Sequence, residues 1–337
     1  MPRNEKLNAW LARQFPNDEL EISPASADAS FRRYLRVAFK DGRPSSIIMD
    51  APPEHEDCRP WLHVEQLLRA AGVHVPEVLA ADLDQGFLLL SDLGSTTYLS
   101  VLENPETQVA APALYGEAVD ALIAIQAASQ EGQLPAYDQP LLRRELDLFP
   151  DWYVAKHLGL SLNETQRQTL ETAFAKILAN NLAQPRVTVH RDYHSRNLMV
   201  TLPNPGIIDF QDAVYGPITY DLVSLFRDAY ISWEEDQELD WVIRYWEKAR
   251  KAGLPVRENF DDFYRDYEWM GAQRQLKVLG IFARLCHRDG KDGYLKDMPR
   301  VMGYLRRTCN RYNDLRPLLR LLEELEPQAE VQVGYTF

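Results

Sequence analysis

Cysteine is scarce in this chain of 337 residues, with three residues that are scattered and odd in number, Cys58, Cys286 and Cys309. This pattern argues against a disulfide framework and a cysteine-based metal site, and it is typical of free thiols in a reducing compartment. Long apolar runs are missing too, since no segment approaches the roughly 20 residues that cross a bilayer. The charged N-terminus also lacks the apolar core of a signal peptide. We therefore expect a cytoplasmic protein without a membrane segment.

Basic residues are also fewer than acidic ones. The chain has 37 Lys and Arg against 50 Asp and Glu, which gives a net charge of −13. Nucleic acids and anionic membranes require a basic face, so neither is the expected partner. The 45% apolar and 26% charged residues are ordinary for a globular protein with one large or two modest domains. The composition favours a small-molecule partner, and we expect a monomer.

Hydrophobic periodicity divides the chain near residues 91 to 95. Before this point the patterns predict a short helix, two strands, a second helix and two further strands. Their ranges are 4–15, 31–39, 46–50, 61–71, 78–82 and 86–90. After it the chain is mostly helical. The sequence therefore predicts an α+β fold, with a nucleotide-binding N-lobe over residues 1–92 and a larger helical C-lobe over residues 93–337.

The most informative stretch is His-Arg-Asp-Tyr-His-Ser-Arg-Asn at 190–197, followed twelve residues later by Asp209. Kinase catalytic loops read H-R-D-x-x-x-x-N, with a magnesium-binding Asp in a turn further on. A β-branched run precedes the loop and a hairpin turn at 201–206 follows it, as a strand, loop and hairpin require. A zinc site at His190 and His194 is disfavoured, because the pair follows a strand and Arg191 replaces the Glu of H-E-x-x-H. The pattern predicts an ATP-dependent phosphotransferase that uses Mg²⁺.

The loop, the turn at 208–212, Gly216-Pro217 and Asp221-Leu222 resemble the aminoglycoside phosphotransferase and choline kinase superfamily. The resemblance implies a two-lobed, protein-kinase-like fold. Within that superfamily the chain is similar to bacterial amino-sugar kinases of cell-wall recycling, notably at 46–53 and 271–274. Those enzymes phosphorylate the anomeric hydroxyl of N-acetylmuramate and N-acetylglucosamine.

The resemblance also implies residue roles. Asp192 would be the catalytic base, and Asn197 and Asp209 the magnesium ligands. His190 would orient the loop and Asp221 would brace it, while His194 is either a brace or a substrate contact. Gln211 and Asp212 are candidates for binding acceptor hydroxyls, although Asp212 is equally a capping or solvated carboxylate.

The nucleotide side departs from the kinase pattern. The turn at 26–31 has no glycine, and Met49 stands where a Lys is expected, which leaves Glu65 without its usual partner. Arg32, Arg33 and Arg36 are candidates for the missing charge. The adenine should lie near residues 90–93, with Val37 and Met49 as its upper wall. The expected nucleotide contacts are Ser30, Phe31, Arg33, Val37, Met49, Leu90, Ser91, Asp92 and Leu93.

Eleven residues separate Asp209 from Asp221, too few for the activation loop of a protein kinase, and this favours a small acceptor. Two basic clusters, Arg143-Arg144 and Arg274 with Lys277, suit an anionic acceptor, though each residue is also explained by a salt-bridged helix surface. Two other functions stay open. One is phosphorylation of an aminoglycoside or another small molecule, and the other is a pseudokinase that binds a ligand without catalysis.

Overall fold

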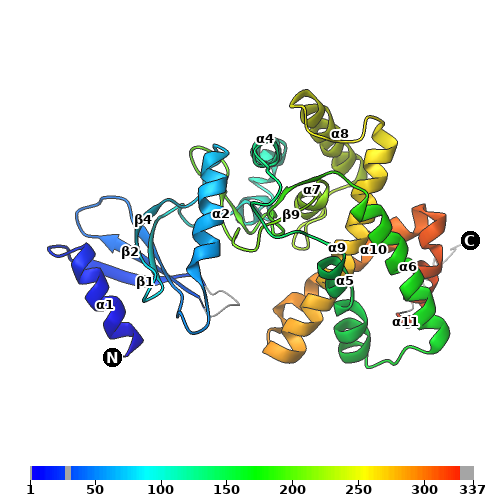
Figure 1. Ribbon diagram of the computed structural model, residues 1–337, viewed down its shortest axis with the longest axis horizontal. Coiled ribbons are helices and arrows are strands. Elements are labelled where there is room, and N and C mark those ends of the chain that lie inside the picture. Colours follow the sequence, from blue (N-terminus) through cyan, green and yellow to red (C-terminus); the bar gives the residue numbers. More distant parts are fainter. Residues whose placement is uncertain (1, 27–31, 327–337) are drawn as a thin grey trace, which may run out of the picture. The chain divides into compact units, whose positions relative to one another are not determined.

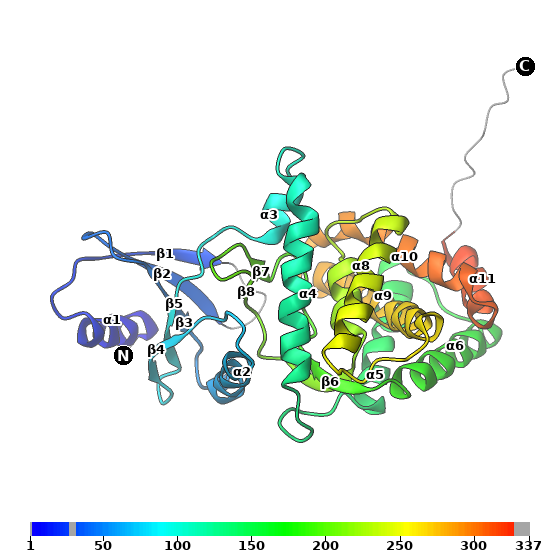
Figure 2. The ribbon, with the colours of Figure 1, turned by 90° about the horizontal axis from the view of Figure 1, so that it is seen from above.

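The computed structural model describes residues 2–26 and 32–326. The chain forms two compact units that interleave along the sequence, drawn in Figures 1 and 2. The first unit contains residues 1–128 and 190–213, and the second contains residues 129–189 and 214–337. The boundary predicted between residues 92 and 93, which separates a β-rich lobe from a helical lobe, stays a prediction.

The first unit contains a five-stranded antiparallel sheet, which the alternating sequence patterns predicted in part. In spatial order its strands are β1 (Leu20–Ser26), β2 (Arg33–Phe39), β3 (Ser46–Asp50), β5 (Phe87–Ser91) and β4 (Val78–Asp82). The edge strand β1 was not predicted. It contains Pro24, next to which the register with β2 shifts, and proline is tolerated in sheets at such edges and bulges.

Helix α1 (Arg3–Gln14) covers one face of this sheet. Its buried residues Leu7, Trp10 and Leu11 pack with every second residue of the neighbouring strands, since side chains alternate between the two faces. The sheet residues in this core are Val37, Ile48, Phe87 and Leu89. The alternate residues of these strands, which include Met49 and Leu90, therefore lie on the other face of the sheet.

The rest of the first unit is helical apart from one hairpin. Its elements are α2 (Cys58–Ala70), α3 (Tyr98–Leu102), η1 (Gln108–Ala110), α4 (Ala111–Ala127), β7 (Leu198–Met199) and β8 (Gly206–Ile207). The hairpin of β7 and β8 is the one that the sequence predicts. Asp57 caps the first turn of α2 by accepting a hydrogen bond from the Arg59 amide.

One helical segment of the described chain, Gln108–Ala127, is long and apolar enough to cross a membrane by length and composition alone. The sequence led us to expect no segment of this length and apolar character, because Glu117 and Asp120 interrupt the apolar run. A single helix of this kind is weak evidence for a span, because core helices of soluble proteins meet the same criteria.

The second unit is built around the 30-residue helix α9 (Phe260–Asp289). The elements before it are α5 (Gln139–Leu146), the π-helix η2 (Phe149–His157), α6 (Glu164–Leu182), β6 (Arg186–Val189), β9 (Val214–Pro217), α7 (Tyr220–Phe226) and α8 (Glu235–Lys251). Those after it are η3 (Asp292–Asp297), α10 (Met298–Arg311), η4 (Asn313–Leu315) and α11 (Arg316–Leu325). Strands β6 and β9 pair antiparallel.

A buried ionic network joins four helices of the second unit. The Arg227 side chain, 0% exposed, donates from Nε to Glu238 at 2.6 Å and from Nη2 to Glu268 at 2.9 Å. Its Nη1 donates to Thr308 at 2.9 Å. Because removing one partner leaves an uncompensated buried charge, such a network fixes α7, α8, α9 and α10 against one another.

We expect Gly280→Ala to destabilise the second unit. A Cβ at this position would lie 2.5 Å from the carbonyl carbon and oxygen of Leu148, and backbone cannot move aside cheaply. The free energy of unfolding, measured by urea titration, should fall by about 1–3 kcal/mol. The matched control is Gly303→Ala on α10, where nothing lies within 4 Å, and which should be neutral or up to about 1 kcal/mol stabilising. Equal effects of the two substitutions would contradict the close approach.

Candidate active site

The predicted catalytic loop lies in the first unit, where a side-chain hydrogen bond and a backbone hydrogen bond attach it to two helices. The Tyr193 hydroxyl, which is fully buried, donates to the carbonyl of Ala118 on α4 at 2.8 Å. The carbonyl of Ser195 accepts from the amide of Leu99 on α3 at 3.0 Å. This role of Tyr193 was not predicted from the sequence. An aromatic residue inside an otherwise polar loop was the available signal.

Two residues of the site adopt left-handed backbone conformations, Arg191 with φ of 76° and Asp209 with φ of 64°. This region is unfavourable for residues with a side chain and is concentrated at functional sites. Within the described chain these are the two such residues that are not glycine. The local strain coincides with the predicted loop and the predicted metal ligand.

The Asn197 amide joins the loop to the acidic turn. Its Nδ2 donates to the Asp192 carbonyl at 3.0 Å and to the Asp209 carboxylate at 3.3 Å. The backbone bond from the Ile208 amide to the Asn197 carbonyl, 3.1 Å, runs parallel to this link. The structure thus brings together the three residues that the sequence placed in one reaction.

Gln211 positions Asp209 from two residues further along the chain. Its Nε2 donates to Asp209 Oδ1 at 2.8 Å, while its own Oε1 is buried without a hydrogen-bond partner in the described structure. Asp212 is exposed, and its carbonyl accepts from Arg191 at 3.4 Å. Gln211 therefore contacts the metal-ligand candidate, a role the sequence did not predict, whereas acceptor binding by either residue stays a prediction.

His190 is buried and lies between the loop and the turn. Its Nε2 donates to the Ile208 carbonyl at 3.1 Å, and its Nδ1 accepts from the Asp192 amide at 3.3 Å. Burial lowers its pKa from 6.5 to about 4, so the ring is neutral near pH 7. A neutral ring with both nitrogens engaged is suited to orienting the loop. His194 is also buried, and its role stays open.

The residues present fit a magnesium ion only in part. Carboxylate and amide oxygens are suitable ligands, and Asp209 and Asn197 carry one of each in side chains that are joined by the 3.3 Å bond from Asn197 Nδ2. No group of three or more His, Cys, Asp or Glu side chains in the described chain could hold a metal by itself. Mg²⁺ commonly takes one or two protein ligands and completes its shell with substrate phosphates and water. The pair therefore fits a metal that arrives with a nucleotide.

The nucleotide contacts predicted on β2 and β3 divide between the two faces of the sheet. Val37 is part of the core beneath α1, and Arg33 bonds to Asn4 of α1, so both lie on the α1 face. Met49 has the opposite parity and accepts a bond from the Tyr34 hydroxyl. Val37 and Met49 therefore cannot form one wall of an adenine pocket, which corrects that expectation. Ser30 and Phe31 lie outside the described residues.

Two of the three candidate replacements for the missing Lys, Arg33 and Arg36, have carboxylate partners. Arg33 binds the buried Asp50, which also accepts from Arg3 Nε at 2.7 Å. This cluster of two cations and one anion keeps one positive charge, and the sequence did not reveal Arg3 as a member. Arg36 bonds to Asp92 at 2.6 Å. Its positive charge is therefore compensated.

The carboxylates of Asp92 and Glu65 differ in the groups that stabilise their negative charge. Burial alone would raise the pKa of Asp92, but hydrogen bonds from Arg36, Ser45 and the Gly94 amide outweigh it and lower the pKa. The Glu65 side chain is 3% exposed, and Arg69 lies 3.6 Å away in the next helical turn. Burial raises the pKa of Glu65. Glu65 thus lacks a Lys partner, as the sequence implies, and has a distant Arg instead.

At the predicted adenine-binding segment, the backbone of Ser91 is occupied. Its amide donates to the Glu77 carbonyl at 2.8 Å, and its Oγ accepts from the Glu77 amide at 2.8 Å. The amide of Leu93 donates to no group in the described part of the chain. The amide of Asp92 has no acceptor in the described chain either, so both positions have a backbone donor to offer.

The predicted acceptor residues of the second unit have varied environments. Arg143 bonds to Asp147 and, through two bonds of 2.6 Å, to Glu171. Arg144 is exposed. Lys277 is buried, where it pairs with Glu145 at 3.0 Å and donates to the Tyr220 hydroxyl at 2.8 Å. Lys277 is thus in an ion pair, as the alternative interpretation expected, but inside the protein rather than on the helix surface, and acceptor binding by it stays a prediction. Arg274 is 4% exposed, and Asp221 is buried in the first turn of α7.

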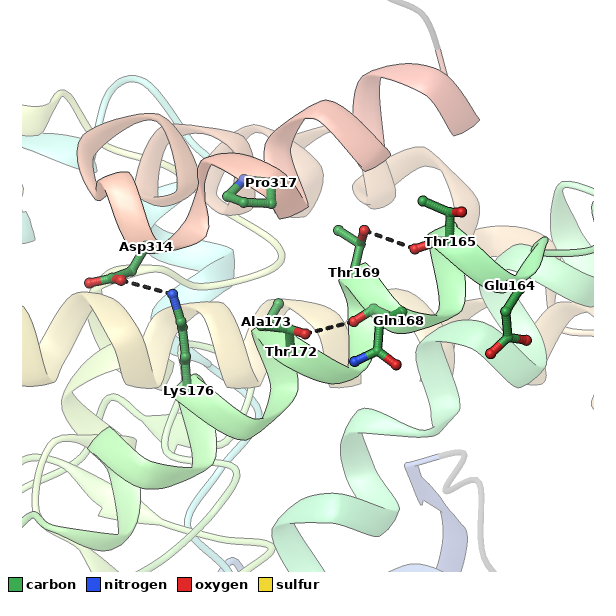
Figure 3. A pocket seen from close by; sticks show the side chains of 9 residues that line it. All are labelled: Glu164, Thr165, Gln168, Thr169, Thr172, Ala173, Lys176, Asp314 and Pro317. Atoms are coloured by element: carbon green, nitrogen blue, oxygen red, sulfur yellow. Dashed lines mark hydrogen bonds and ion pairs between the residues drawn. The ribbon is translucent and has the colours of Figure 1, made fainter.

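A groove of about 440 Å³ lies on the second unit between α6 and α11 (Figure 3). Its threonine hydroxyls bond to carbonyls of their own helix, as Thr169 does to Thr165 and Thr172 to Gln168. The Lys176–Asp314 ion pair closes one end. No predicted functional residue lines this groove.

The family comparison decides the class of the protein. The model of the phosphotransferase enzyme family matches residues 21–260. The chain belongs to this family. The predicted reaction class, phosphoryl transfer to an alcohol, is therefore confirmed for this phosphotransferase.

Curated relatives align with the phosphotransferase over most or all of their length. The N-acetylmuramate/N-acetylglucosamine kinase of Neisseria meningitidis is 52% identical over 337 residues, which is 100% of both chains. The proteins of that name from Pseudomonas aeruginosa and Caulobacter vibrioides are 49% and 32% identical, over 97% and 82% of this chain and 98% and 85% of their own. These relatives are kinases, which implies that the phosphotransferase uses ATP.

Solved structures confirm the predicted α+β, kinase-like fold. The ADP-bound aminoglycoside phosphotransferase APH(2'')-Ib has a TM-score of 0.59 at 13% identity, covering 89% of this chain and 97% of its own. A choline kinase from Streptococcus pneumoniae has a TM-score of 0.60 at 12% identity, covering 89% and 99%. At such low identity the likeness shows the fold alone.

We expect His190 to make the stability of the phosphotransferase depend on pH. Because the pKa of His190 is lower in the folded chain, the unfolded chain binds a proton at this residue below pH 6.5, whereas the folded chain binds it only below about pH 4. The stability that this group contributes is thus complete above pH 6.5 and is lost as the pH falls towards 4, by about 3 kcal/mol. Urea titrations across this range should show the difference between wild type and His190→Gln shrinking as the pH falls. His63→Gln on the exposed surface of α2 is the control, and a pH-independent difference for His190→Gln would contradict the assignment.

Proposed function

We propose that the protein transfers the γ-phosphoryl group of MgATP to the anomeric hydroxyl of N-acetylmuramate or N-acetylglucosamine. Such a reaction would return cell-wall amino sugars to metabolism. We also propose that it works as a monomer in the cytoplasm, without nucleic acid or membrane partners. The low count of basic residues and the scattered free thiols support these last points.

The observation that carries the proposal is the Asn197 amide, bonded to the Asp192 carbonyl and the Asp209 carboxylate. A protein that only binds a ligand has no use for a proton acceptor held beside two oxygen ligands. Backbone strain at Arg191 and Asp209 supports the same conclusion, because it persists where function compensates its cost. These features disfavour the pseudokinase alternative.

In the proposed reaction, the Asp192 carboxylate accepts the proton of the C1 hydroxyl as its oxygen attacks the γ-phosphorus. A new O1–phosphorus bond forms, the bond to the β,γ-bridging oxygen breaks, and ADP leaves with that electron pair. Asp209 and Asn197 would hold Mg²⁺, which neutralises charge on the phosphates when bound. Gln211 keeps the Asp209 carboxylate in orientation through its 2.8 Å bond.

Support for an amino-sugar acceptor comes from the curated relatives, whose shared name covers both sugars. The identity of 52% extends over the whole chain, including the parts outside the matched family region. The aminoglycoside alternative rests on structures at 13% identity, which carry no argument about the acceptor. For the nucleotide, the Leu93 amide is the proposed donor to adenine.

We expect Asp192→Asn to lower kcat by about 10²–10⁴-fold, because it removes the proton acceptor but keeps the side-chain shape. Binding of ATP, measured by calorimetry, should change little. Asp84→Asn, on an exposed turn of the same unit, is the matched control and should retain wild-type kcat. More than about a tenth of wild-type kcat in Asp192→Asn would remove this residue from the role of general base.

The product should be an acid-labile sugar 1-phosphate. Phosphorus NMR of the product of N-acetylglucosamine and ATP should show coupling to the anomeric proton, and mild acid should release phosphate. A stable 6-phosphate would refute the anomeric site while leaving the kinase intact. Turnover of an aminoglycoside with neither sugar accepted would overturn the proposed acceptor.

A further inference from the structure

Arg36 lies on the face of the five-stranded sheet opposite α1. It pairs with Ile47, and Ile47 pairs with Leu90, so these three side chains form one row across β2, β3 and β5. Val37, the next residue of β2, points to the α1 face instead. Asp92 is the second residue after Leu90 and the first beyond the end of β5. The guanidinium of Arg36 binds Asp92, so it contacts the chain at the point where the chain leaves the sheet.

The carboxylate of Asp92 accepts four hydrogen bonds. Arg36 donates from Nε to Asp92 Oδ2 at 2.6 Å and from Nη2 to Asp92 Oδ1 at 3.1 Å. Ser45 donates from Oγ to Oδ2 at 2.6 Å, and the Gly94 amide donates to Oδ1 at 2.8 Å. The Asp92 side chain is 5% exposed. A guanidinium and a carboxylate joined by two bonds fix each other in orientation as well as in distance.

Arg36 also holds the main chain two residues further on. Its Nη2 donates to the Gly94 carbonyl at 2.9 Å, and Gly94 has a left-handed φ of 84°. On its other side the segment contacts the hairpin of β7 and β8. The Leu93 side chain lies against Gly206 of β8, where a Cβ would come within 3.0 Å of Leu93 Cδ1. Residues 92–94 are therefore held both by the sheet and by the hairpin that follows the catalytic loop.

This arrangement leaves two backbone donors of the segment available. The amides of Asp92 and Leu93 have no acceptor in the described chain, whereas the Gly94 amide is used within the turn. Donors that are already fixed bind a ligand without the entropic cost of ordering them. We propose that Arg36 is a positioning residue for the nucleotide base, which acts through Asp92 to hold the two amides in place for adenine. This inference rests on the proposed function, in which the Leu93 amide donates to adenine.

The competing role for Arg36 is to neutralise the nucleotide phosphates in place of the missing Lys. Its ion pair with Asp92 disfavours that role, because the charge is already compensated. The two roles differ for a ligand without phosphates, since adenosine keeps the base and lacks every group that a phosphate-binding cation contacts. Loss of Arg36 weakens adenosine and MgATP by equal factors if Arg36 acts on the base, and MgATP alone if it acts on the phosphates.

The test measures the dissociation constants of adenosine and MgATP for wild type and Arg36→Gln, by competition with a fluorescent ADP analogue. Both constants should rise by about 10-fold, because charge-assisted hydrogen bonds are lost. With N-acetylglucosamine as acceptor, kcat at saturating MgATP should stay within about threefold, since the base is bound equally before and during phosphoryl transfer. Arg43→Gln, which removes an exposed ion pair with Asp18 from the same unit, should leave both constants unchanged. A rise for MgATP alone, a rise for neither ligand, or failure of wild type to bind adenosine would overturn the proposal.

Two further variants decide the proposal if Arg36→Gln does not fold. Arg36→Lys keeps the charge but cannot form two parallel bonds with the Asp92 carboxylate, so both constants should still rise. Wild-type affinity for MgATP in Arg36→Lys would assign the charge to the phosphates and overturn the proposal. Ser45→Ala removes another donor to Asp92 without a change of charge, and it should raise both constants by a smaller factor. Unchanged constants in Ser45→Ala and Arg36→Lys together would also refute it.

A double-mutant cycle tests whether Arg36 acts through Asp92. Asp92→Asn alone should raise both constants, and its combination with Arg36→Gln should raise them no further than the stronger single substitution. Additive effects would show that Arg36 acts by itself. No sugar is present in the binding measurements, so a wrong acceptor would leave them unaffected. Failure of wild type to bind MgATP would refute the proposed function together with this inference.

Discussion

The amide of Asn197 is the contact on which the catalytic arrangement depends. One nitrogen reaches the main chain of the loop and the side chain of the acidic turn, so the positions of Asp192 and Asp209 are set together. The left-handed backbone at Asp209 aims its carboxylate at this amide, and Gln211 holds the second oxygen. All four residues belong to one compact unit, which means that this geometry is supported by the unit's own core. Phe210, next to Asp209, contributes by packing against Trp61 of α2, with the two ring centroids 5.0 Å apart and the rings tilted.

The residues of this site could be predicted because their spacing is local in sequence. A loop, a hairpin and a turn that follow one another directly along the chain bring their side chains close together. Strands with clear alternation, such as β2 and β3, were predictable for the same reason. The edge strand β1 was not predictable, since Pro24 weakens its sequence pattern. The strand forms because it pairs with β2. Which sheet face each residue occupies was also hidden, because the face is set by where α1 packs.

Charge pairing was the least predictable feature. Arg3 and Asp50 are 47 residues apart, and Arg227 and Glu268 are 41 residues apart, so only the folded chain reveals them as partners. A basic residue in a helical pattern is predicted to be exposed, because the sequence does not show whether a carboxylate from another element lies beside it. Lys277, which pairs with Glu145, is an example. The structure thereby changes the status of most of the predicted cations. It explains Arg36, Arg143 and Lys277 as ion pairs.

The interleaving of the two units has a consequence for how the protein is made. Residues 190–213 complete the first unit, yet they follow the segment 129–189, which belongs to the second. A ribosome therefore releases the sheet, α2 and α4 well before the loop that packs on them, and Tyr193 arrives after its acceptor at Ala118. No contiguous fragment contains either unit alone and complete, so the enzyme cannot be divided by simple truncation.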